Sequence, residues 1–304
     1  MIVMNFILIH MAPGDPVLIL VGQISGVTPG YLDFIRHKYG LDLPIYVQLY
    51  RYVATVLRGD LGYSYFYQEP VLNVILERLP ATLLLMVSAL SLASILGIVL
   101  GVISSKKPYS LTDSGVTVVC LLGYSLPVFW LGQVLLLFFA MYLGLFPVGG
   151  MFPLGAKLSG VSLAVAILHR LVLPAVTLSF YYLAMITRLT RASMLEVFNA
   201  DYVVAARSKG LPERIVTSRY VLRNALIPVV TVIGMSAGYM IAGSVLVETI
   251  FDWPGDGRLI FDSIVSRDYP TLMGMFVVLC FSVILANLFV DILYSYLDPR
   301  VRYK

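Results

Sequence analysis

The residues whose types and spacing are best suited to chemistry form a polar, basic segment, 195–228, between two apolar stretches. A segment this charged cannot lie in lipid, so it is expected to be a solvated loop. Asp201 is placed to N-cap a short helix from about Tyr202 to Lys209, because its carboxylate can accept hydrogen bonds from free backbone N–H groups and suits the positive end of the helix dipole. The chemistry predicted for this loop is binding through an ordered surface.

The residues that follow this short helix predict where it stops. Gly210 can adopt the left-handed conformation that ends a helix, which costs glycine nothing because it has no side chain. Leu211-Pro212-Glu213 then begins a second helix, with proline where its missing N–H is harmless and an acid in the first turn. The loop is therefore expected to consist of a helix, a tight stop and a second helix.

Catalytic motifs are scarce in the rest of the sequence. It contains no Gly-x-x-x-x-Gly-Lys-Ser/Thr phosphate loop, no His-Glu-x-x-His and no Gly-x-Ser-x-Gly serine motif. The three histidines and two cysteines lack the spacing of metal ligands, which argues against a metal site. Any work that the protein performs is therefore expected to draw its energy from a partner.

Polar side chains that punctuate the apolar stretches have two interpretations. They form hydrogen bonds between helices, which the Gly234-x-x-x-Gly238 spacing favours because small residues let helices approach closely. Alternatively, they line a pathway for a flexible polar solute. Asp291 is either an interfacial carboxylate, paired with Arg300 or with another chain, or part of that pathway. The candidate pathway residues are Tyr124, Ser125, Gln133, Ser236, Tyr239, Asn287 and Asp291.

The elements that position these residues are expected to be membrane-spanning helices. The sequence is 59% hydrophobic and only 12% charged, with a mean hydropathy of +0.90, which is outside the range of soluble domains. Pro127 is expected to tilt or kink the second of five uncharged stretches that are long enough to span a bilayer. These stretches are Ala81 to Ser105, Ser114 to Phe146, Leu171 to Thr187, Ala225 to Val247 and Thr271 to Val290.

The amino-terminal part of the chain is expected to differ from this core. Residues 1–12 are apolar but too short to span, so they are interpreted as the remnant of a truncated first transmembrane helix or as a signal-like segment. Residues 13–80 are expected to form an external region with a surface-lying helix around Ile45 to Leu57. Residues 81–304 form the core transmembrane domain, which carries the loop 195–224. The predicted fold is an all-α membrane protein of about six spanning helices.

The distribution of basic residues predicts the orientation of these helices. Lysine and arginine cluster in the loops near residues 106, 188–223 and 300–304, whereas the intervening loops include the acidic stretch 248–268. Because positive residues are retained on the cytoplasmic side, the basic loops and the carboxyl terminus are expected to be cytoplasmic.

The basic loop also carries a family resemblance. Ala205-Ala206-Arg207-Ser208-Lys209-Gly210-Leu211 resembles the "EAA" coupling loop of permease subunits in bacterial and archaeal ABC importers. Asp201-Tyr202 and Leu222-Arg223-Asn224-Ala225-Leu226-Ile227-Pro228 look like the oligopeptide, dipeptide and nickel branch. Val204 stands where the glutamate of the loop's name would be, and Arg223 where a later proline would be, and the peptide branch often departs in this way.

The resemblance extends over the rest of the chain. Further segments are similar to the first of the two permease subunits in peptide importers: Pro13-Gly14-Asp15-Pro16, Gly40-Leu41-Asp42-Leu43-Pro44, Gln48, Tyr50, Gly59-Asp60-Leu61-Gly62-Tyr63-Ser64 and Arg78-Leu79-Pro80-Ala81-Thr82. The fold that this resemblance implies is the transmembrane domain of a type I ABC importer. The family builds a complete first span where this sequence begins, so the short amino terminus is a departure.

The resemblance implies a function that depends on partners. The expected partners are a homologous second permease subunit, two cytoplasmic ATPase subunits, an extracytoplasmic substrate-binding protein and membrane lipid, with no nucleic acid. ATP and Mg would be bound by the ATPases, and this chain would hold no cofactor and no ATPase site of its own. The resemblance implies a bacterial or archaeal inner membrane location and a short helix that docks in a groove of an ATPase. The implied coupling residues are Asp201, Tyr202, Ala205, Ala206, Arg207, Lys209, Gly210 and Leu211.

The substrate and the class of protein leave alternatives open at this stage. Peptides are favoured, while oligosaccharides and nickel complexes are transported by members of the same branch. The spans lack clusters of histidine, cysteine and acidic residues, which argues against bare nickel. A channel or an intramembrane enzyme working without ATP would need a charged filter or a catalytic pair within the spans, and the sequence shows neither.

Overall fold

The computed structural model describes residues 3–4, 6–7, 30, 33–34, 37, 42–64, 66–153, 155 and 158–297. These residues are mostly helical, and within these ranges Tyr63 and Pro70 form an isolated β-bridge. The named elements are α4 (Ile45–Leu57), α5 (Val71–Lys106), α6 (Leu111–Ser125), α7 (Val128–Leu135), the π-helical η1 (Leu136–Tyr142), α8 (Val161–Phe198), α9 (Asp201–Ser208), α10 (Glu213–Ile215), the π-helical η2 (Val216–Val221), α11 (Leu222–Ile250), α12 (Asp256–Val265) and α13 (Tyr269–Leu297).

Apolar helices account for the five uncharged stretches of the sequence. In the described part of the chain, four helical segments are long and apolar enough to cross a membrane: Val71–Lys106, Val161–Phe198, Glu213–Gly238 and Tyr269–Leu288. A fifth crossing results if α6 and the α7–η1 segment count as one broken span, because the two are bent by 105°. Pro127 lies at this break and precedes α7 without an N–H to donate, so the expected kink is confirmed as a sharp bend.

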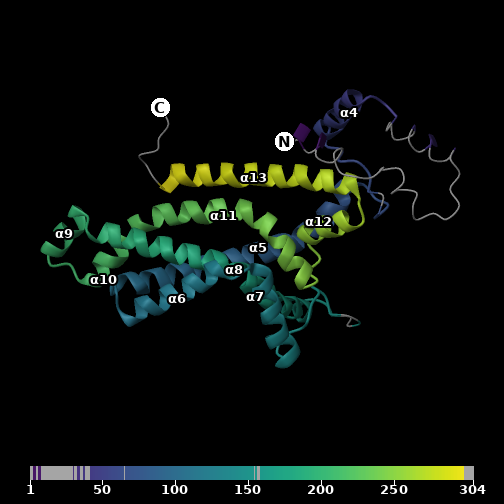
Figure 1. Ribbon diagram of the computed structural model, residues 1–304. Helices are drawn as coiled ribbons and strands as arrows, with labels where there is room; N and C mark the ends of the chain where they lie inside the picture. Colours follow the sequence, from purple (N-terminus) through teal and green to yellow (C-terminus); the bar gives the residue numbers. More distant parts are fainter. Residues whose placement is uncertain are drawn as a thin grey trace. The chain divides into compact units, whose positions relative to one another are not determined.

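The chain divides into two compact units, and the larger one comprises residues 81–257 and 282–304. In this unit α8 packs against α6, α7 and α11 (Figure 1). Two glycines of α5 lie very close to α8, since a Cβ atom on Gly101 would lie 2.5 Å from Thr190 and one on Gly97 would lie 2.8 Å from Ile186. Small residues thus let α5 contact α8 directly, as expected of helix pairs in membranes.

A buried ion pair fastens α6 to α8 in the same unit. Asp113 is 3% exposed and accepts hydrogen bonds from Nε and Nη2 of Arg191, both at 2.7 Å. It also accepts from the hydroxyl of Ser104 and, at 2.7 Å, from the backbone N–H of Tyr109. Arg191 falls in the stretch 188–223 that was expected to belong to a loop, whereas it lies in α8 and forms one satisfied pair with Asp113 of α6.

A second polar cluster lies where α11 ends. Glu248 is fully buried and accepts a hydrogen bond of 2.9 Å from the hydroxyl of Thr82. The Thr82 oxygen accepts in turn from the backbone N–H of Asp256 at 2.7 Å, and the indole of Trp253 donates to the carbonyl of Ala81 at 2.9 Å. These bonds tie the turn after α11 to the beginning of the core part of α5.

The smaller unit comprises residues 1–80 and 258–281. The predicted helix at Ile45–Leu57 is confirmed as α4, and none of its residues is buried. Asp268 precedes α13 and accepts hydrogen bonds from the hydroxyls of Thr271 and Ser64, so it links the start of that helix to the segment before α5. The proposed remnant helix at 1–12 and the motifs of residues 13–41 fall almost entirely outside the described residues.

Candidate partner-binding surface

The basic loop folds into the short helix that the sequence predicts, with a shift of one residue. Helix α9 begins at Asp201, and Ala200 occupies the N-cap position without any side-chain cap. The prediction that Asp201 caps the helix is therefore wrong, because its backbone is already helical and its carboxylate projects from the first turn. An acid in the first turn still complements the positive end of the helix dipole.

The predicted stop at Gly210 is confirmed. Its φ of +74° lies in the left-handed region, and no neighbouring atom lies within 4 Å of the position of a Cβ atom. Pro212 takes the N-cap position of α10, with Glu213 in the first turn. This second helix continues through η2 into α11, so the loop connects directly to a membrane-spanning helix.

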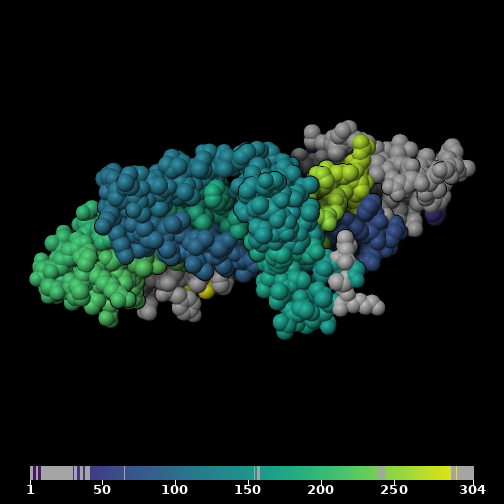
Figure 2. Space-filling model, turned by 90° about the horizontal axis from the view of Figure 1, so that it is seen from below, coloured from purple at the N-terminus to yellow at the C-terminus, as the bar shows by residue number. Residues whose placement is uncertain are grey.

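Helix α9 has one buried and one exposed face. Val203 and Ala206 are 0% and 4% exposed and pack against a cluster formed by Met194 of α8, by Val216 and Val221 of η2 and by Ala225 of α11. Ala205 and Tyr202 are exposed. The expectation that both alanines face a partner differs from the structure, since Ala206 contacts its own chain. Figure 2 shows this loop, coloured green, as a continuous outer surface of its unit.

The basic end of α9 is partly neutralised within the chain. Arg207 donates from Nη2 and Nε to the carboxylate oxygens of Glu213 at 2.8 and 3.2 Å, across the stop at Gly210. The carboxylate raises the pKa of the Arg207 guanidinium, which also lies 5.5 Å from the ring of Phe198. Lys209 has no ion-pair partner in the described part of the chain. Arg207, one of the implied coupling residues, is thus already paired within its own chain.

The candidate pathway residues do not all come together. Tyr124 is exposed near the end of α6, and Ser125 is the last residue of that helix, just before the break at Pro127. Gln133 is exposed on α7, and Asn287 is exposed on α13. The side chains of Tyr239 and Asp291 lie outside the described residues, and so does Arg300, with which Asp291 was expected to pair.

Ser236 does not form the hydrogen bond between helices that the first interpretation expects. It is buried, and its hydroxyl donates to the carbonyl of Val232 in the same helix at 2.7 Å, so its hydrogen bond is satisfied locally. Gly238 supports the packing role of the small residues, because a Cβ atom there would lie 3.4 Å from Ala286 of α13.

Sequence reasoning missed one residue beside this candidate pathway. Arg188 was counted as a loop charge, but it lies within α8, with its guanidinium 5.9 Å from the ring centre of Tyr124. The available signal was its place directly after the uncharged run 171–187. Among the described residues, no group of three or more metal-ligating side chains is found.

Comparison with known families gives matches along almost the whole chain. The family described as "Binding-protein-dependent transport system inner membrane component" matches residues 93–303. A second family, described as "Binding-prot-dependent transport system membrane comp, N-term", matches residues 1–86. Together the two matches cover both the helical core and the amino-terminal part.

Individual relatives match over nearly their full lengths. The oligopeptide transport system permease protein AppB of Bacillus subtilis is 40% identical, over 99% of this chain and 94% of its own. The di/tripeptide transport system permease protein DppB of Pseudomonas aeruginosa is 41% identical, with the same coverage. The dipeptide transport system permease protein DppB of Escherichia coli is 38% identical, over 99% of this chain and 94% of its own.

Solved structures share the fold at low sequence identity. The MetNI methionine ABC transporter in an inward-facing conformation matches with a TM-score of 0.59 at 15% identity, over 75% of this chain and 97% of its own. An amino acid ABC transporter with histidines matches with a TM-score of 0.55 at 13% identity, over 74% of this chain and 94% of its own. The predicted fold, the transmembrane domain of a type I ABC importer, is confirmed.

Proposed function

The chain belongs to the family of binding-protein-dependent transport system inner membrane components, and we propose that it forms half of the pathway by which such a system imports di- or oligopeptides. The observation that carries this proposal is the near-full-length similarity, at about 40% identity, to permeases named for oligopeptides, di/tripeptides and dipeptides. The other half would come from a homologous second permease subunit, and a substrate-binding protein would deliver the peptide from outside.

The energy for transport would come from two ATPase subunits docked on the exposed face of α9. The sequence contains no nucleotide-binding motif, so ATP and Mg would be held by those partners. The basic loops favour a cytoplasmic location for α9 and for the carboxyl terminus. Tyr202 is 44% exposed on this face, and an aromatic side chain of this kind is a common anchor in interfaces.

The packing of α9 supports a route by which an ATPase could move the pathway. Val203 and Ala206 are buried between the ends of α8 and α11, so a displacement of α9 acts directly on both membrane helices. The bond between Arg207 and Glu213 bridges the stop at Gly210, within the same loop. Coupling of this kind requires that the ATPases bind two arrangements of the helices with different affinity.

The coupling assignment is tested by placing a carboxylate on the proposed docking face and, as a control, at an exposed position elsewhere. Ala205→Glu puts a carboxylate on the exposed face of α9, whereas Leu111→Glu puts one at a position 93% exposed at the start of α6. We expect Ala205→Glu to abolish co-purification of the ATPases and peptide uptake, while Leu111→Glu retains both. Normal uptake by the Ala205→Glu variant would refute the coupling surface. Ala206→Glu is not informative, because it disrupts a buried contact within the chain.

The substrate class is tested with the complete transporter in vesicles. ATP hydrolysis is measured after adding the cognate binding protein together with a dipeptide, an oligosaccharide or a nickel complex. Stimulation by the dipeptide, accompanied by its uptake, is the expected result. Stimulation by the sugar or by nickel alone would overturn the assignment of peptides while leaving the family membership intact.

A further inference from the structure

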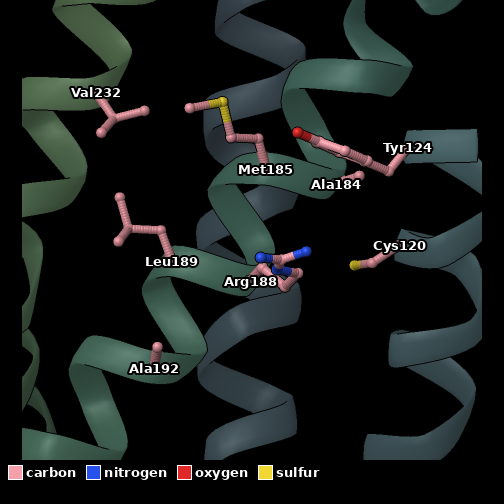
Figure 3. A pocket seen from close by; sticks show the side chains of 8 residues that line it. All are labelled: Cys120, Tyr124, Ala184, Met185, Arg188, Leu189, Ala192 and Val232. Atoms are coloured by element: carbon pink, nitrogen blue, oxygen red, sulfur yellow. The ribbon is translucent and has the colours of Figure 1, made fainter.

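A cavity of about 330 Å³ lies among three helices of the larger unit. Cys120 and Tyr124 of α6 reach toward Arg188 on α8, and Val232 of α11 lies on the opposite side (Figure 3). Ala184 and Ala192 of α8 leave the space open because their side chains are short. The volume falls at the lower end of the range of small-molecule sites, and the walls are largely apolar, as such sites usually are.

Arg188 brings a positive charge to this cavity. Arg191, one turn further along α8, is neutralised by Asp113. Arg188 has no carboxylate partner in the described part of the chain, and its guanidinium lies 5.9 Å from the ring centre of Tyr124. A guanidinium within a membrane helix is costly unless it faces water, a partner or an anion, so this charge marks a functional position.

The walls of the cavity are held in place before any ligand enters. Gly123 lets α6 lie directly on α8, because a Cβ atom there would be 3.0 Å from Ala184 and 3.1 Å from the carbonyl oxygen of Phe180. The ring of Tyr124 is stacked on that of Tyr181, with 5.2 Å between the centroids. A ligand would therefore meet a preformed site, which lowers the entropy cost of binding.

We propose that this cavity, defined by Arg188, Tyr124 and Cys120, is a transient binding site for the carboxyl-terminal carboxylate of a peptide in passage. The proposal rests on the proposed function, and it deepens it by naming the part of the substrate that the membrane domain recognises. Guanidinium groups bind carboxylates through strong, charge-assisted hydrogen bonds. The aromatic and aliphatic walls suit the apolar side chain beside that carboxylate. A site for a lipid phosphate would share the guanidinium, and the experiment separates the two.

The occupant is identified by photo-crosslinking in the complete transporter, with the binding protein, in vesicles of phosphatidylethanolamine and phosphatidylglycerol. Benzoylphenylalanine replaces either Tyr124 or Leu122, an exposed residue on the opposite side of α6. During turnover with radiolabelled alanyl-alanine, we expect label at position 124 and little at position 122. Crosslinks to phospholipid alone at position 124, or equal peptide label at both positions, would overturn the proposal.

The role of the charge is tested in the same vesicles without the crosslinker. Arg188→Gln is expected to lower alanyl-alanine uptake by at least about tenfold, the effect of losing one charge-assisted hydrogen bond, while Arg188→Lys retains more. ATP hydrolysis stimulated by the binding protein shows that each variant is assembled. If the wild type imports the dipeptide and Arg188→Gln imports it equally well, the proposed site is overturned while the proposed function stands. A wild type that hydrolyses ATP but imports no dipeptide would instead overturn the proposed function, and this site with it.

Discussion

The buried ion pair between Asp113 and Arg191 gives the sharpest test of the packing. Arg191→Met removes the guanidinium and leaves a carboxylate that is 3% exposed, still bonded to Ser104 and to the backbone N–H of Tyr109. Breaking a buried pair from one side costs about 3–5 kcal/mol. Because those bonds remain and the Arg191 side chain is 26% exposed, we expect the free energy of unfolding to fall by the lower end of this range, about 3 kcal/mol. This is a decrease of roughly 150-fold in the ratio of folded to unfolded protein.

The measurement is unfolding by sodium dodecyl sulfate in mixed micelles, followed by tryptophan fluorescence. Trp253 is fully buried and reports on the same unit. The matched control is Arg188→Met, since Arg188 lies one turn away and has no carboxylate partner in the described part of the chain. It should change stability by less than about 1 kcal/mol. Adding Asp113→Asn to Arg191→Met should recover part of the loss. Equal effects of the two arginine substitutions would refute the pairing argument.

Three further predictions use the same unfolding assay together with uptake. Gly101→Ala should lower the free energy of unfolding by about 1–3 kcal/mol, because the new Cβ atom would lie 2.5 Å from Thr190. The control Gly115→Ala has nothing within 4 Å of its Cβ atom and should leave that free energy unchanged or raise it by up to about 1 kcal/mol. The reverse order of the two effects would contradict the α5–α8 contact. Gly210→Val should lower the free energy of unfolding by about 1–2 kcal/mol and impair uptake, since φ at this position is +74°. Gly210→Asn should retain most uptake, and equal uptake by both variants would count against the left-handed stop. Glu213→Gln should change stability by less than about 1 kcal/mol, because its ion pair is exposed, and a larger loss would show that the pair holds the loop together.

Local patterns predicted several elements closely. The helix at Ile45–Leu57, the break at Pro127 and the stop at Gly210 all follow from residues that act on their own backbone. The position of Asp201 was wrong by one residue, which is the usual uncertainty at the end of a helix. Which of two adjacent alanines is buried was not predictable, since Ala205 and Ala206 are equally small and the burial of Ala206 depends on α8, η2 and α11.

The sequence by itself determined the membrane class, the apolar stretches and the presence of an ordered basic loop, because hydrophobic length, proline and glycine act locally. The tertiary structure decided what each charge does. Arg191 is paired with Asp113, 78 residues away in the chain, and Arg207 with Glu213 across a reversal of the backbone. Arg188 is left facing a cavity. Charges on distant segments interact only over a few ångströms, so their partners are fixed by how the helices pack and not by their order in the sequence.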